Sequence, residues 1–161
     1  MGKIETEKTE IRLLGLDGIG QLKSLYGDFF AYNAKLQPKY YKESVISEEY
    51  PKSVILSKED DIFVAVRDGI IVGFIHVQEN KTPPYDSYVP YRYAEIIELF
   101  VAGEFRKLGI GAKLFDAVKV WSKGRGLAYI EAMVLAEAEG EIMFYEKKEF
   151  KKRAHIIRCE L

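Results

Sequence analysis

Apolar residues recur along the chain at two spacings, which predict strands where they alternate and helices where they return every three or four positions. Ile11 and Leu13 alternate with polar neighbours and predict a first strand. Asp17 then offers an N-cap for a helix that should end near Gln37 and Pro38. The apolar face of this helix would carry Leu22, Leu25, Tyr26, Phe29 and Phe30.

A weaker helical pattern and a strong hairpin pattern come next. Residues 40–46 predict a second helix, and Pro51 interrupts whatever follows it. Residues 62–66 and 70–77 are largely apolar and flank Arg67-Asp68-Gly69, where Asp-Gly readily adopts the positive φ angles of a tight primed turn. Two antiparallel strands are therefore predicted here.

The second half of the chain predicts further strands and helices around a proline-rich loop. In order, these are a loop over 80–92, a strand over 94–101, a helix over 110–121, a strand over 127–135, a helix over 138–148 and a strand over 150–161. Alternation of Ile157, Cys159 and Leu161 suggests the last strand. Together the pattern predicts a mixed α/β protein with about six strands and three or four helices.

Length and composition narrow the class of protein. The 161 residues suit one domain over 1–161, and 24 Lys and Arg against 25 Asp and Glu give a net charge of -1, which argues against a nucleic-acid partner. The lone Cys159 cannot form an internal disulfide, and we find neither a leader-like apolar start nor an apolar stretch of about 20 residues. We therefore expect a cytoplasmic protein without a membrane partner. His76 and His155 lack neighbours at metal-ligand spacing, so we expect no metal and assign both to structural or surface roles.

The clearest chemical signal is a segment that runs from the strand residues Leu99–Val101 through a turn into Arg106–Ala112, where the next helix begins. The first turn of a helix has backbone N–H groups without partners, and these groups and the helix dipole attract phosphate. The two glycines of the segment would let a ligand approach the backbone, and its two basic residues add positive charge. The pattern predicts an anion site, although two glycines at this spacing can also mark only a tight turn and a packing contact.

The second half of the chain resembles the GNAT superfamily of acyl-CoA-dependent N-acetyltransferases. The resemblance covers about residues 61–161 and rests on the strand 95–101, the R-x-x-G-x-G segment with its helix, and Phe144-Tyr145-Glu146-Lys147 followed by Phe150. It implies a single GNAT-like α/β (α+β) domain, whose mixed and mostly antiparallel sheet of about six or seven strands is splayed at its centre and flanked by about four helices. It also implies an acetyltransferase that carries the acetyl group of acetyl-CoA to an amine in a ternary complex.

The same resemblance assigns the residues of the CoA site and the general acid. The strand residues Leu99, Phe100 and Val101 would pair with the pantetheine arm of CoA. The pyrophosphate would be held by Arg106, Lys107, Leu108, Gly109, Ile110, Gly111 and Ala112. Tyr145 would protonate the CoA thiolate as it leaves.

The reaction also needs a base, because an amine attacks a thioester only in its neutral form and an alkylamine has a pKa of about 10.4. Glu95 and Glu98 lie on the predicted strand beside the thioester, and either carboxylate could take the proton directly or through a water. Their spacing of three would put them on opposite faces, so that only one points into the slot. In some family members the base matches the position of Glu95, and both residues remain candidates. We expect a bulge that frees the N–H of Leu99 or Phe100 for the oxyanion.

Two departures from the family pattern leave an alternative open. Members commonly carry Asn where this chain has Ala138 and Gly where it has Glu149. A non-catalytic module that binds or senses acyl-CoA is therefore the alternative to an N-acetyltransferase. We expect the acceptor to be a primary amine of a small molecule or peptide, and we leave a homodimer open. Aromatic residues available for a small cationic amine, or equally for core and loop packing, are Tyr26, Phe30, Tyr40, Tyr41, Tyr85, Tyr88 and Tyr91.

Overall fold

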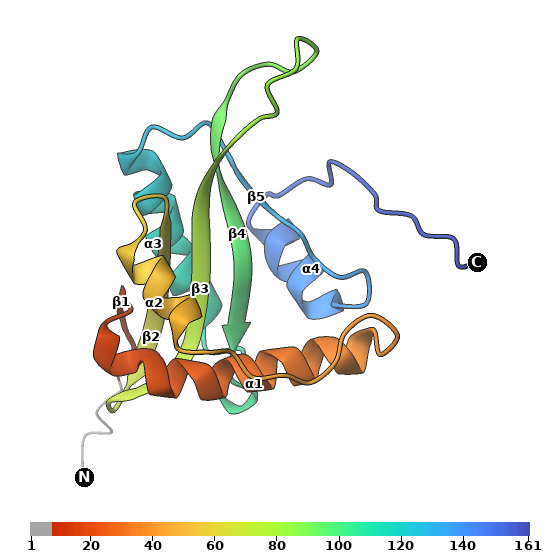
Figure 1. The fold of residues 1–161 in the computed structure, drawn as a ribbon. Helices are drawn as coiled ribbons and strands as arrows, with labels where there is room; N and C mark the ends of the chain where they lie inside the picture. The colour runs from red at the N-terminus through yellow and green to blue at the C-terminus, as the bar shows by residue number, and fades with distance from the viewer. Residues whose placement is uncertain (1–7) are drawn as a thin grey trace.

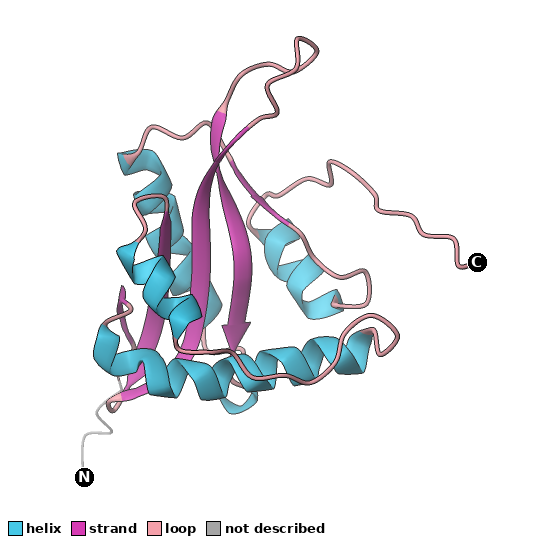
Figure 2. Cartoon of the chain, in the orientation of Figure 1, coloured by secondary structure: helices cyan, strands magenta, loops and turns pink. Residues whose placement is uncertain are grey.

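The computed structural model describes residues 8–161 and arranges them as one sheet with helices on both faces (Figures 1 and 2). The strands are β1 (Glu10–Leu13), β2 (Asp60–Arg67), β3 (Ile70–Lys81), β4 (Arg92–Val101) and β5 (Ile130–Ala132). The helices are α1 (Ile19–Leu36), α2 (Glu49–Leu56), α3 (Ile110–Gly124) and α4 (Glu139–Lys147), with short 3-10 turns η1 (Leu16–Gly18) and η2 (Gly103–Phe105). Strands neighbour one another in chain order, and only the β4–β5 pair is parallel. The predicted mixed, mostly antiparallel sheet with four flanking helices is confirmed.

The predicted number of six or seven strands is wrong, because the described residues form five. Residues 150–161 run as an extended segment that trails away from α4 (Figure 1), and Ile156 and Ile157 are 78% and 92% exposed. Alternating apolar residues make a strand only where a neighbouring strand pairs with their N–H and C=O groups. This segment is held by side chains instead, since Glu160 accepts hydrogen bonds from Lys39 and Tyr40.

The predicted hairpin is confirmed, and its turn has the expected backbone. Asp68 and Gly69 have φ angles of 49° and 76°, and Arg67 and Ile70 pair directly across the turn. Positive φ at both central residues is what a primed turn requires. The hairpin is followed by a second and longer one, in which β3 and β4 extend together away from the helices (Figure 1).

The predictions for the first helices were partly wrong. The first helix does end near Gln37, which is its C-cap, but Asp17 lies in η1 and the N-cap of α1 is Gly18, without a side-chain cap. The helix predicted over residues 40–46 is absent from the structure, and α2 lies later in the chain and contains Pro51. Proline fits there because Pro51 is in the first turn of α2, where the backbone N–H would have no helical partner anyway.

The core has two layers, one on each face of the sheet. The face covered by α1 and α2 buries Leu22, Tyr26 and Val54 against Phe74 of β3. The opposite face is covered by α3, whose predicted buried stripe is confirmed at Ile110, Leu114, Phe115 and Val118, with Trp121 partly buried. Successive residues of a strand therefore point alternately toward α1 and α2 or toward α3. No helix in the described part of the chain has the length and apolarity needed to cross a bilayer.

Candidate active site

β4 and β5 diverge at one edge of the sheet, where β5 is the last strand. They pair only from Ala94 to Ile96 on β4 and from Ile130 to Ala132 on β5, whereas β4 continues to Val101. Figure 1 shows the chain after β5 leaning away from β4 toward α4. Residues 98–101 therefore pair with β3 on one side and, among the described residues, have no strand partner on the other. We predicted a sheet splayed at its centre, whereas in the described residues the strands splay between the edge strand β5 and its neighbour β4.

A β-bulge at Ile97 changes which way the two candidate glutamates point. Glu98 pairs with His76 and Ile96 pairs with Val77, so Ile97 is the extra residue of β4. We predicted the bulge near Leu99 or Phe100, and it lies two residues before Leu99. One extra residue reverses the alternation of side chains along a strand. The prediction that Glu95 and Glu98 lie on opposite faces is therefore wrong.

The contacts of the two glutamates confirm that they share the face covered by α1 and α2. Glu98 contacts His76, and Glu95 accepts a hydrogen bond from Asn80. His76 and Asn80 are four residues apart on β3, so their side chains point to the same face. Glu98 also accepts a short hydrogen bond from the hydroxyl of Tyr26, which belongs to α1.

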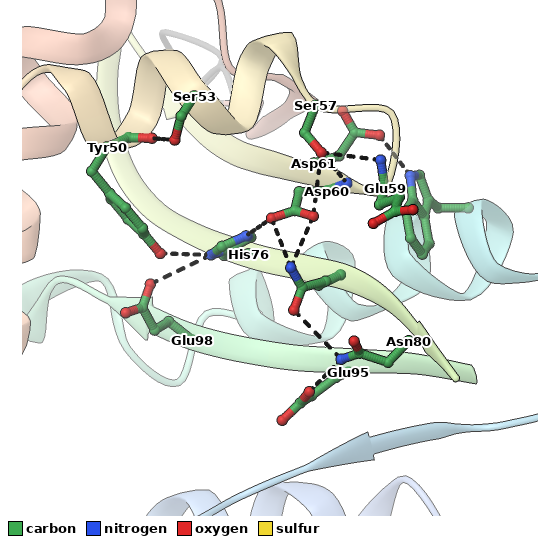
Figure 3. Close-up of polar contacts among 12 residues, drawn as sticks. Tyr50, Ser53, Ser57, Glu59, Asp60, Asp61, His76, Asn80, Glu95 and Glu98 are labelled. Carbon is green, nitrogen blue, oxygen red and sulfur yellow. Dashed lines mark hydrogen bonds and ion pairs between the residues drawn. The ribbon is translucent and has the colours of Figure 1, made fainter. Parts of the chain in front are cut away.

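Glu98 belongs to a compact polar cluster (Figure 3) on the face of the sheet that holds the apolar core under α1 and α2. The Nδ1 atom of His76 lies 3.8 Å from Oε2 of Glu98 and 2.9 Å from the hydroxyl of Tyr50 on α2. The Nε2 atom of the same ring lies 3.3 Å from Oδ2 of Asp60 on β2. Three elements, α1, α2 and β2, thus contribute one side chain each around His76 and Glu98, and that of α1 is Tyr26.

Burial keeps the two tyrosines of this cluster protonated. His76 is 3% exposed and Tyr26 is completely buried. Burial, and then the neighbouring Glu98 carboxylate, raise the pKa of Tyr26 far above its ordinary value. The same two causes raise the pKa of Tyr50 to about 12. Both hydroxyls therefore remain hydrogen-bond donors at neutral pH.

The polar cluster continues along the sheet as far as Glu95. Gln78 donates to both carboxylate oxygens of Asp60, and Asn80 donates to Gln78 and to Glu95. We assigned His76 to a structural or surface role and did not predict Tyr50 or Asp60 as site residues. A signal was present in the sequence, because His76 and Gln78 are polar at a spacing of two on either side of Val77, where the apolar run that begins at Ile70 comes to its end.

The predicted phosphate segment forms the start of α3. Gly109 is the N-cap with a φ of 78°, and Lys107 also has a positive φ of 62°. The first hydrogen bond of the helix runs from Lys113 to Gly109, so the amides of residues 110–112 have no acceptor among the described residues. Lys107, Leu108 and Gly109 are exposed, whereas the side chain of Ile110 is in the core.

Arg106 lies against the end of β4 and against α1. Its Nε donates to the carbonyl of Val101 at 2.9 Å, and its guanidinium carbon is 5.2 Å from the ring centres of both Tyr32 and Phe100. Burial raises the pKa of the nearby Glu141 carboxyl, and the positive charge of Arg106 opposes that rise. The guanidinium therefore stacks on aromatic rings at the mouth of the β4–β5 opening.

Tyr145 on α4 lies in the core layer beside α3. It is 7% exposed and packs against the rings of Phe144 and Phe150, and burial followed by the Glu141 carboxylate raises the pKa of its hydroxyl. A methyl group on Gly111 would lie 3.4 Å from the Phe144 ring, so α4 packs directly beside the start of α3. The predicted general acid and the predicted phosphate segment are thus neighbours.

The aromatic residues predicted to form one acceptor site lie in separate places. Tyr26 and Phe30 pack with one another in the core, whereas Tyr85 and Tyr88 pack together at the far tip of the β3–β4 hairpin (Figure 1). Tyr40 follows α1 and lies under Arg158 of the C-terminal segment. Aromatic composition alone could not reveal this, because the long hairpin carries its loop away from the body of the sheet.

Comparison with known proteins connects this geometry to a family. The model of the acetyltransferase (GNAT) family matches residues 22–150. An uncharacterized N-acetyltransferase of Methanocaldococcus jannaschii is 33% identical over 89% of this chain, and N-alpha-acetyltransferase 60 of Danio rerio is 27% identical over 91%. The chain spans 61% of the length of each of these two relatives.

Solved structures share the fold at low sequence identity. A tetramutant of the BH1408 protein of Bacillus halodurans superposes with a TM-score of 0.89 at 17% identity, covering 94% of this chain and 99% of that one. The aminoglycoside acetyltransferase AAC(6')-Iy, in complex with the bisubstrate analog CoA-S-monomethyl-acetylneamine, gives a TM-score of 0.72 at 15% identity, covering 96% and 98%. Because a family model covers most of the chain and the sheet opens beside a free helix start, the chain belongs to the acetyltransferase (GNAT) family.

Proposed function

We propose that this protein transfers the acetyl group of acetyl-CoA to a primary amine of a small molecule or peptide, by direct attack within a ternary complex. The observation that carries the proposal is the position of the β4–β5 opening. The free amides at the start of α3 follow this opening in the chain, and Tyr145 is near that helix start. Glu98 lies on the other face of β4, the face covered by α1 and α2. A thioester in the opening would thus lie between a group that binds phosphate and a carboxylate that binds protons.

The cofactor side of the site would be formed by the end of β4 and the start of α3. The unpaired edge of Leu99–Val101 can hydrogen-bond the amides of the pantetheine arm, as an added strand would. The pyrophosphate would accept hydrogen bonds from the amides of residues 107–112 and gain from the helix dipole. Lys107 and Arg106 supply positive charge, and Arg106 would turn from its aromatic contacts toward the phosphates.

We assign the base to Glu98. It lies next to the bulge and to the unpaired part of β4, whereas Glu95 lies where β4 is still paired with Glu131 of β5. Glu98 would take a proton from the ammonium form of the acceptor, and the neutral amine would then attack the thioester carbonyl. The amide of Ile97, the residue of the bulge that has no register partner on β3, would stabilise the oxyanion.

Tyr145 would complete the reaction by donating its phenolic proton to the CoA thiolate. Burial raises the pKa of Tyr145, which keeps the hydroxyl protonated until the thiolate forms. The aminoglycoside ligand of the structural neighbour and the name of the Danio rerio relative both support an amine acceptor. The alternative, a non-catalytic acyl-CoA-binding module, rests on Ala138, which is buried at the start of α4 and offers no polar group.

Two measurements test the proposal. Acetyl-CoA at about 100 times its dissociation constant should stabilise the protein by about 2.7 kcal/mol, which raises the melting temperature by roughly 5–10 °C. Free CoA should then appear when members of a panel of amines, aminoglycosides and peptides are added. A thermal shift without CoA release would establish the non-catalytic module, and the absence of a thermal shift would contradict both functions.

A matched pair of variants locates the cofactor site. Gly109 and Gly126 lie near opposite ends of α3, both have positive φ, and neither has a neighbour within 4 Å of an added Cβ. Gly109→Leu and Gly126→Leu should therefore lose similar amounts of stability through backbone strain. Only Gly109→Leu should lose the acetyl-CoA thermal shift. Equal shifts in the two variants would show that the start of α3 does not bind CoA.

A further inference from the structure

We propose that His76 is a positioning residue that relays the acceptor's proton away from Glu98. The proposal rests on the proposed acetyl transfer and adds a proton path to it. The imidazole of His76 lies between the Glu98 and Asp60 carboxylates, at 3.8 Å and 3.3 Å, inside the face covered by α1 and α2. A buried histidine between two carboxylates is a group that can hold and pass a proton.

The neighbours of His76 determine which ring nitrogen carries the proton. An ionised carboxylate only accepts hydrogen bonds, so Asp60 requires the proton of the neutral ring to be on Nε2. The Nδ1 atom then has a free lone pair, and the hydroxyl of Tyr50 donates to it at 2.9 Å. Because burial and the Glu98 carboxylate raise the pKa of Tyr50 to about 12, this hydroxyl keeps its proton at neutral pH. The free base of His76 therefore faces Tyr50 and Glu98.

The groups packed around His76 come from several elements. Asp60 faces it from β2, Glu98 from β4 and Tyr50 from α2, and Tyr26 of α1 bonds to Glu98 behind it. The two nearest charged groups are both carboxylates, so each can accept a hydrogen bond from the ring. Asp60 is itself fixed by Gln78 and by the hydroxyl of Ser57, so it is held in place as the ring charges.

The proposed path conserves protons at each step. The N–H bond of the acceptor ammonium breaks, the electron pair stays on the amine, and an O–H bond forms on Glu98. That O–H bond then breaks and an N–H bond forms at Nδ1 of His76, with the Tyr50 hydroxyl or a water bridging the 3.8 Å between the two atoms. Glu98 is again a carboxylate, and the imidazolium lies between two negative charges. The imidazolium then gives this proton up to solvent through a water, so both Glu98 and the neutral ring are restored before the next acceptor binds.

The tautomer of His76 can be measured directly, because the chain has only two histidines. In protein labelled with ¹⁵N-histidine, His155 on the exposed C-terminal segment provides the reference signal. At neutral pH, His76 should show a proton on Nε2 and an unprotonated Nδ1. Asp60→Asn should convert this single tautomer into a mixture. A proton on Nδ1 of the parent protein would overturn the proposal, because the relay atom would already be occupied.

Kinetics distinguish a proton relay from a packing role. His76→Gln should lower kcat for CoA release about 10- to 100-fold while leaving the KM for acetyl-CoA and its thermal shift unchanged. It should also remove the acid-side limb of the parent's pH profile, and His155→Gln should change neither quantity. If His76→Gln does not fold, Asp60→Asn, at the edge of the cluster, should still lower kcat and move that limb.

The outcomes separate the relay from the function on which it rests. A parent protein that releases CoA, together with a His76→Gln variant whose pH profile is unaltered, would refute the relay and leave acetyl transfer intact. A parent protein that releases no CoA with any amine would refute the proposed function, and the relay with it. Reduced kcat with the parent's pH profile would indicate that His76 only supports the packing of Glu98.

Discussion

Glu149→Gly should stabilise the protein, because Glu149 holds a backbone conformation that glycine adopts more easily. Its φ is 66°, and its amide donates to Glu146 while the amide of Phe150 donates to Tyr145, both at 3.0 Å. These two bonds form a Schellman motif at the end of α4, and the ring centres of Phe150 and Tyr145, 4.9 Å apart, supply its apolar contact. Family members commonly carry glycine here, so this departure retains the expected turn and the position of Tyr145.

The magnitude follows from two opposing effects. A side chain in the left-handed region costs about 1–2 kcal/mol, and glycine loses about 0.5–1 kcal/mol more conformational entropy on folding. Glu149→Gly should therefore raise the free energy of unfolding by roughly 0.5–1 kcal/mol, measured by urea denaturation, and the melting temperature by roughly 1–4 °C. Glu149→Ala removes the carboxylate but keeps a Cβ, so it should show no such gain. Equal gains in the two variants would refute the reasoning, because the charge and not the backbone would then be responsible.

Three further predictions concern the site. Glu98→Gln should lower kcat about 100-fold or more and keep the acetyl-CoA thermal shift, whereas Glu95→Gln should change kcat only a few-fold. Both are measured by steady-state release of CoA, and a larger loss in Glu95→Gln than in Glu98→Gln would assign the base to Glu95. Tyr145→Phe should lower kcat far more than CoA affinity. Tyr88→Phe, at the hairpin tip, is the control and should change neither quantity in the same assay. An unaltered rate in Tyr145→Phe would exclude Tyr145 as the acid. Because the pKa of Tyr50 is about 12 against an ordinary value of about 10, its contribution to stability is complete below pH 10 and is lost between about pH 10 and 12. Urea denaturation over that range should show a shallower fall in stability for Tyr50→Phe, and parallel curves would contradict the raised pKa.

Elements that depend on local chemistry could be predicted from the sequence. The turn at Asp68-Gly69 needs only residues that tolerate positive φ, and the stripe of α3 needs only apolar residues at helical spacing. The phosphate segment combines both signals, since it places a glycine N-cap directly before an amphipathic helix. These features were found because the residues that cause them are neighbours in the chain.

Features that depend on pairing between distant segments could not be predicted in the same way. Residues 150–161 alternate like a strand, yet no edge of the sheet pairs with them in the described structure. The bulge at Ile97 exists only in the register between β3 and β4, and nothing in the residues around it marks the position. His76 likewise acquires its role from Tyr50, Asp60 and Glu98, which are contributed by three other elements.

The bulge at Ile97 connects these distant pairings to the proposed chemistry. Without the extra residue, Glu95 and Glu98 would face opposite layers of the core. If Glu95 kept its present position, the carboxylate of Glu98 would then point into the apolar layer under α3. Burial of an unpaired carboxylate in such a layer costs several kcal/mol. With the bulge, Glu98 lies where Tyr26 and His76 can bond it, at the strand segment that β5 leaves open. A single shift in register therefore explains both how the carboxylate is tolerated and why it lies at the opening.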